Sequence, residues 1–175
     1  MFHSGTQTLI DLWSGLPESR RVPARADLEP MAFGRLVPQL FTADRIEESV
    51  RLRLAGGWIE SLHGLPLRDV EWLSLWRRES RPLVASSVLQ VFREARPVVL
   101  AADAPGLDGV LEIVIAPLRG PTGAADRLIG LYQPTHLGDR FAEVAGPLNV
   151  RLAVGVGPVE RPPLILAAVD GRRIA

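Results

Sequence analysis

Apolar residues near the start of the chain are separated by three and four positions. Between residues 6 and 16 they are Leu9, Ile10, Leu12, Trp13 and Leu16. This spacing places them on one face of an amphipathic helix, and Gly15 and Pro17 mark its end. We therefore predict an N-terminal helix within residues 1–19. Its apolar face could pack on the core of the same chain or on a second subunit, and the pattern leaves both open.

A polar segment follows this helix, over residues 18–30. Its prolines, Pro23 and Pro30, favour an extended linker that leads into a short helix over residues 30–35. Asp27 is placed to cap that helix, because a carboxylate can accept an amide hydrogen bond in the first turn. We interpret Asp27 as structural rather than ligand-binding.

The next segments predict a β-hairpin followed by helices. Strands are expected over residues 38–46 and 50–55, and in the second strand arginine alternates with leucine at the two-residue period of a half-buried strand. Helical spacing then predicts helices over residues 58–62, 70–76 and 81–95.

Three more strands are predicted over residues 98–102, 110–118 and 128–133. Proline and glycine at 104–106 and 120–123 separate them, so both connections indicate antiparallel hairpins. The whole order is typical of an α+β domain with a five-stranded antiparallel sheet flanked by helices.

The remaining residues, 136–175, are interpreted as a C-terminal extension. A helix is expected over 136–145 and short strands over 150–156 and 164–169. The domain itself is then predicted to span residues 20–135.

Three short runs carry a resemblance to a known family: PARADLEP at 23–30, LVPQLF at 36–41 and RLRLAGG at 51–57. They resemble the pattern PaRaDldP, LLPhLf and RLRLAGT of bacterial stand-alone PAS domains, which are commonest in alphaproteobacteria. The resemblance covers about residues 20–135. It implies a PAS-like fold, with the helix at 58–62 roofing a pocket, and a role in sensing or regulation.

Composition narrows the classes of partner. The net charge is zero, with 20 basic and 20 acidic residues interleaved along the chain, so we expect no nucleic-acid binding. The absence of cysteine excludes disulfides, thiolate metal sites and the cysteine-linked chromophores known in light-sensing PAS proteins. No apolar run could span a bilayer and no export signal is visible, so we expect a cytoplasmic protein without a membrane partner.

Candidate metal and cofactor chemistry centres on His63. The three histidines, His3, His63 and His136, are not spaced to share a metal, so we expect no metal site. His63 follows the expected pocket helix, where some PAS sensors offer a haem ligand. The other interpretation, which we favour, is that His63 simply ends the helix, where a cationic imidazole suits the negative end of the helix dipole. The identity of any cofactor stays unassigned.

Trp58, Trp72 and Trp76 cluster between the second and third expected strands, where they could line a pocket for a flat ligand or simply fill the core. We favour core packing. Glu112 points away from its apolar neighbours in the expected strand and needs a partner, for which Arg25, Arg51 and Arg53 are candidates. The candidate ligand-binding residues are Trp58, Leu62, His63, Trp76, Phe92, Glu112 and Tyr132.

Enzyme motifs are not found: the chain has no nucleophile elbow and no phosphate-binding loop with lysine. We predict a non-catalytic sensory or regulatory domain that acts through contacts with a separate signalling protein and is gated by a small molecule. A homodimer through the N-terminal helix is also expected. The alternatives are an isomerase-like pocket enzyme that uses Glu112 with His63, and a ligand-free adaptor with a filled core.

Overall fold

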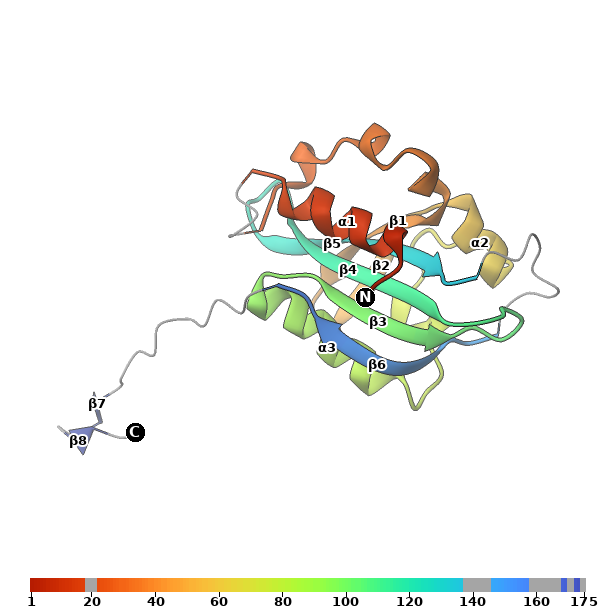
Figure 1. The fold of residues 1–175 in the computed structure, drawn as a ribbon. Helices are drawn as coiled ribbons and strands as arrows, with labels where there is room; N and C mark the ends of the chain where they lie inside the picture. The colour runs from red at the N-terminus through yellow and green to blue at the C-terminus, as the bar shows by residue number, and fades with distance from the viewer. Residues whose placement is uncertain (18–21, 137–145, 158–167, 170–171, 174–175) are drawn as a thin grey trace.

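The computed structural model describes residues 1–17, 22–136, 146–157, 168–169 and 172–173 (Figure 1). Its main feature is an antiparallel sheet with the strand order β2-β1-β5-β4-β3-β6. The strands are β1 (Leu40–Ile46), β2 (Ser49–Ala55), β3 (Val98–Asp103), β4 (Leu111–Arg119), β5 (Ala125–Pro134) and β6 (Asn149–Gly155). The helices are α1 (Ser4–Ser14), α2 (Gly57–His63) and α3 (Arg81–Glu94), with 3-10 helices η1 (Arg25–Asp27), η2 (Pro30–Gln39) and η3 (Trp72–Leu75). A separate pair of short strands consists of β7 (Ala168–Val169) and β8 (Arg172–Arg173).

Helices cover both faces of the sheet. Figure 1 shows α1 crossing one face and α3 lying behind the other. One apolar core lies between the sheet and α2, η3 and α3, and a second lies between the sheet, α1 and η2. We call these two sides the α3 face and the α1 face.

The central strand β4 shows how the sequence supplies both cores. Ile113 and Ile115 belong to the core on the α3 face, whereas Val114 and Ala116 belong to the core on the α1 face. Because successive side chains of a strand point to opposite faces, a strand buried on both sides is a continuous apolar run.

The apolar face of α1 packs within the chain. Leu9, Ile10 and Trp13 are buried against the sheet, and the indole Nε1 of Trp13 donates to the carbonyl of Pro117 at 2.8 Å. The residues of α1 that remain exposed include Gln7 and Asp11, which are polar. Of the two arrangements that the pattern left open, the structure has packing on the chain's own core.

The sheet has six strands rather than the predicted five. The sixth, β6, was expected to be part of a C-terminal extension, but it pairs along β3 from Val98 to Asp103 and so completes the sheet. The predicted helix at 136–145 lies outside the described residues from 137 onward. Of the predicted strand at 164–169, only 168–169 are described, as β7.

Three local predictions were wrong in detail. The predicted helix at 70–76 is the 3-10 helix η3. Residues 38 and 39, predicted to begin the first strand, belong to η2, which is kinked at Gly34. Asp27 does not cap the helix that follows it, because its carboxylate accepts the amide of Ala24 at 3.3 Å and so closes η1. Among the residues that the structure describes, no helix combines the length and apolar character needed to cross a bilayer.

Candidate functional site

The core on the α3 face contains a cluster of aromatic rings beneath α2, formed by Phe41, His63, Trp72, Trp76 and Tyr132. The ring centroids of Trp72 lie 5.5 Å from those of both Phe41 and Trp76. The Tyr132 ring lies 5.6 Å from Phe41 and 6.0 Å from His63, edge-on in both cases. Edge-on rings at these separations attract one another, which stabilises the cluster. We call it the aromatic cluster.

The turns on either side of α2 bring His63 into this cluster. Gly56, just before α2, approaches the backbone of Pro38 so closely that a Cβ there would collide with it. Gly64 ends α2 with φ of 67°, a left-handed conformation that suits glycine. Since α2 is held at both ends, its last residue, His63, faces the sheet and is only 5% exposed.

Glu71 fastens the other side of the cluster to the sheet. Its carboxylate accepts hydrogen bonds from the hydroxyl of Ser49 and from the backbone amide of Val50. The Val50 nitrogen lies 3.3 Å from the Glu71 Oε1. The same carboxylate accepts the amide of Leu73 and so caps η3. This holds Trp72 against Phe41 of β1 and Tyr132 of β5.

The polar atoms of the cluster are not all satisfied. Trp72 donates its Nε1 proton to the hydroxyl of Tyr132 at 3.0 Å. The Nε2 of His63 and the Nε1 of Trp76 are buried without a hydrogen-bond partner among the described residues. Burial lowers the pKa of His63 from 6.5 to about 4 and raises the pKa of Tyr132. Both groups are therefore neutral at neutral pH.

The structure brings most of the predicted site residues to the α3 face. Leu62, His63, Trp76 and Tyr132 are buried in this core. Trp58 and Phe92 are partly buried at its edge. The guanidinium carbon of Arg45 lies 5.2 Å from the Phe92 ring centroid, in a cation–π contact.

Glu112 is the exception, because its side chain points to the α1 face. Its carboxylate accepts the backbone amide of His3 at 3.0 Å, in place of the arginine partner that we expected. Arg53, one of the expected partners, instead pairs with Asp44 and Asp69. The sheet therefore lies between Glu112 and His63.

The expected ligand-binding residues left out two members of the aromatic cluster, Phe41 and Trp72, although Trp72 was considered as a possible pocket wall. Phe41 is the last letter of the run LVPQLF, and its strand alternation with Ala43 could have placed it on the α3 face. Trp72 was noticed for its helical spacing, but only the 3-10 geometry of η3 turns it under Tyr132.

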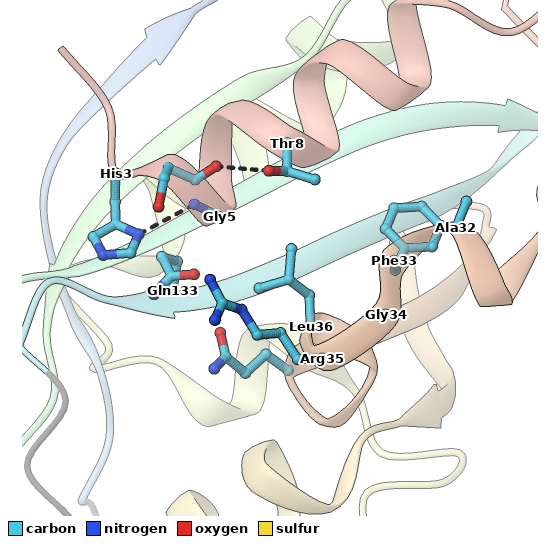
Figure 2. Close-up of a pocket in the computed structure, with 11 residues that line it drawn as sticks. His3, Gly5, Thr8, Ala32, Phe33, Gly34, Arg35, Leu36 and Gln133 are labelled. Atoms are coloured by element: carbon cyan, nitrogen blue, oxygen red, sulfur yellow. Dashed lines mark hydrogen bonds between the residues drawn. The ribbon is translucent and has the colours of Figure 1, made fainter.

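A cavity on the α1 face was also not predicted. It has a volume of about 610 Å³ and lies between the first turn of α1, η2 and the end of β5 (Figure 2). Its walls include His3, Thr8, Phe33, Arg35 and Gln133. These residues come from three distant segments, so no local pattern marks the cavity.

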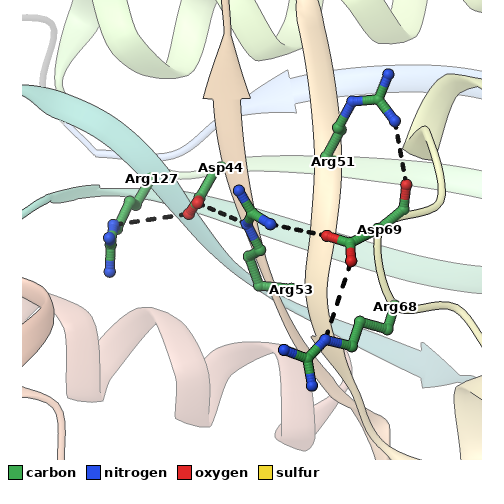
Figure 3. A network of polar contacts seen from close by, with 6 residues as sticks. All are labelled: Asp44, Arg51, Arg53, Arg68, Asp69 and Arg127. Atoms are coloured by element: carbon green, nitrogen blue, oxygen red, sulfur yellow. Dashed lines mark hydrogen bonds and ion pairs between the residues drawn. The ribbon is translucent and has the colours of Figure 1, made fainter.

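A network of charged side chains ties β1, β2 and β5 together on the α1 face (Figure 3). Arg53 lies 2.7 Å from Asp44 and 2.7 Å from Asp69, and Arg127 lies 3.6 Å from Asp44. Arg25 joins the lining of a small adjacent pocket of about 310 Å³. Within the described part of the chain, no group of three or more histidine or acidic residues could hold a metal ion.

A family model described as "PAS domain" matches residues 1–133. No curated protein matches the chain. Similar solved structures include the light state of the blue-light photoreceptor Aureochrome1 LOV, with 12% identity, a TM-score of 0.46, and coverage of 61% of this chain and 88% of that one.

Two other solved structures are similar to a comparable extent. A light-oxygen-voltage domain studied with a flavin analogue has 16% identity and a TM-score of 0.42, over 56% of this chain and 77% of that one. An RNA-binding light-oxygen-voltage receptor has 17% identity and a TM-score of 0.45, over 67% of this chain and 35% of that one.

Proposed function

Because this chain belongs to the PAS domain family, we propose that it is a non-catalytic regulator that binds a small molecule at the aromatic cluster and signals to a separate protein. We place it in the cytoplasm, where proteins rarely contain disulfide bonds, in keeping with a chain without cysteine. The partner is a protein rather than a nucleic acid, in keeping with the zero net charge.

The observation that carries this proposal is the pair of unpartnered polar atoms, Nε2 of His63 and Nε1 of Trp76. A buried donor or acceptor without a partner costs about 1–3 kcal/mol. A ligand that accepts from the indole and pairs with the imidazole would recover this cost. Such a ligand would be a neutral polar molecule, since the surrounding rings offer no charged group and burial disfavours the imidazolium.

A route from this site to the other face of the sheet runs through η2. The segment before α2 packs against the backbone of η2, where Gly56 meets Pro38. η2 in turn contacts α1. A ligand that shifts α2 would therefore press on η2 and α1, which lie at the surface of the α1 face. We propose this path for the signal.

Exposed apolar side chains on β6 support a protein partner. Leu152 is 50% exposed and Val154 is 43% exposed, and β6 is an edge strand of the sheet. A homodimer through α1 remains a prediction, but its contact would have to use the polar outer side of the helix, where Gln7 and Asp11 lie.

The isomerase-like alternative loses its geometric basis, because Glu112 and His63 lie on opposite faces of the sheet. The ligand-free adaptor differs from the sensor in one measurable respect, the presence of a bound molecule. The same test therefore separates sensor from adaptor.

We would compare native and denaturing mass spectra of the full chain, purified without dialysis. A mass that is lost on denaturation, and that is missing from a His63→Phe variant, would support the proposal. His136→Phe is the matched control, because it replaces an exposed imidazole. A bare polypeptide mass in both spectra would favour the adaptor, and the native oligomer mass would test the dimer.

A further inference from the structure

The cavity between α1, η2 and β5 is separate from the aromatic cluster. Tyr132 belongs to the core on the α3 face, and its neighbour Gln133 points to the α1 face, where it lines this cavity. Its volume of about 610 Å³ falls in the range of small-molecule sites. Binding of a ligand in this cavity is therefore independent of His63.

Gln133, Gln39 and Thr8 each bring a side-chain oxygen acceptor to the lining of this cavity. Gln133 is 2% exposed, and its Nε2 donates to the carbonyl of Pro134 at 2.9 Å, which leaves Oε1 as the acceptor without a partner. The Oε1 of Gln39 is also buried without a partner among the described residues. Thr8 donates its hydroxyl proton to the carbonyl of Ser4 at 2.8 Å, so its oxygen can accept. Three acceptors suit an ammonium group, which has three donors and no acceptor.

Arg35 also lines this cavity. Figure 2 shows the side chain of Arg35 pointing toward Gln133. Arg35 has no ion pair or hydrogen bond to any other described residue, so its guanidinium can bind a carboxylate in the two-pronged manner typical of arginine. Glu112, which binds the amide of His3, is the nearby negative charge. The carboxylate of Glu112 disfavours a second anion beside His3 and favours a ligand's ammonium group at that end of the cavity.

One wall of the cavity is apolar, with side chains of Ala32, Phe33 and Leu36 from η2. The cavity therefore offers acceptors for an ammonium group, an arginine for a carboxylate and an apolar wall for a hydrocarbon side chain. An amino acid carries all three groups. We propose that this cavity binds an α-amino acid with an apolar side chain.

The test titrates the ¹⁵N-labelled full chain with L-leucine and follows amide chemical shifts. Two analogues of the same size each remove one feature: 4-methylpentanoate lacks the ammonium group and L-leucinamide lacks the carboxylate. We expect saturable shifts in α1, η2 and the end of β5, and at least about tenfold weaker binding of either analogue.

Variants locate the site. Arg35→Ala should weaken leucine binding at least about tenfold, whereas Arg78→Ala, at another exposed arginine, should leave it unchanged. Gln133→Met, which removes the amide acceptor at similar volume, should also weaken binding. His63→Phe should have no effect, because His63 lies on the other face of the sheet.

Several results would overturn this proposal. One is the lack of saturable shifts with leucine, valine and phenylalanine at about 20 mM, a concentration suited to small ligands of modest affinity. Equal binding of 4-methylpentanoate and leucine is another, because the acceptors would then have no role. Loss of leucine binding in His63→Phe, with Arg35→Ala unaffected, would move the site to the aromatic cluster.

Discussion

Lowering the pH should destabilise this protein through His63, and the size of the effect follows from its burial. The folded state holds the pKa of His63 at about 4, below its ordinary value of 6.5, because the ring is desolvated. As the pH falls, the unfolded chain therefore takes up a proton before the folded chain does. Stability contributed by the neutral ring is complete above about pH 6.5 and is lost as the pH falls toward about 4.

The expected magnitude can be worked out from these two values. Linkage gives a loss of about 2 kcal/mol in the free energy of unfolding between about pH 7.5 and about pH 5. For a chain of 175 residues, this corresponds to a fall in melting temperature of about 4–8 °C. Carboxylates also titrate in this range, so the raw pH dependence does not isolate the histidine.

The assay therefore compares the natural chain with His63→Phe by urea unfolding at both pH values. Near pH 7.5 the variant should be within about 1 kcal/mol of the natural chain, because the lost polar atom has no partner and the ring is similar in size. Near pH 5 the natural chain should have lost about 2 kcal/mol more than the variant. His136→Phe controls for the general effect of replacing an imidazole. Parallel pH profiles of natural chain and His63→Phe would refute the argument.

Three further predictions concern stability. Gly56→Ala should cost about 1–3 kcal/mol in calorimetry because its Cβ would collide with the backbone of Pro38, whereas Gly57→Ala, with open space around its Cβ position, should not destabilise; equal melting temperatures would contradict this. Trp13→Phe should lower the free energy of unfolding in urea by about 1–3 kcal/mol, because the carbonyl of Pro117 in β4 loses the indole donor. An unchanged urea midpoint would argue against that hydrogen bond. Arg53→Ala should lower the melting temperature at low salt and little at high salt, because exposed ion pairs are screened; a salt-independent loss would point to packing instead.

The candidate site was predictable only in part from the sequence. His63 and Trp76 were recognised because they lie in the segment between the second and third strands, and the structure places both in the aromatic cluster. Glu112 was assigned to the same site, although strand alternation already pointed it away from Ile113. That alternation was the stronger signal, because neighbours in a strand always face opposite sides.

The fold followed largely from local patterns. The spacing of α1, the hairpin of β1 and β2, and the turns around β4 depend on residues close together in the chain, so each can be recognised without knowing the rest. The family signature in the linker and in β2 then identified the architecture. The number of strands was missed because β6 joins the sheet by pairing with β3, some fifty residues earlier, and no local signal specifies such a partner.

Sequence alone therefore determined the order of elements, the two apolar faces of the sheet and the family. Tertiary structure decided which face each helix covers, the burial that lowers the pKa of His63, and the cavity that joins Arg35 to Gln133. The physical reason is the range of the interactions. Periodicity and turn chemistry act within a few residues, whereas desolvation and cavities arise only when distant segments pack together.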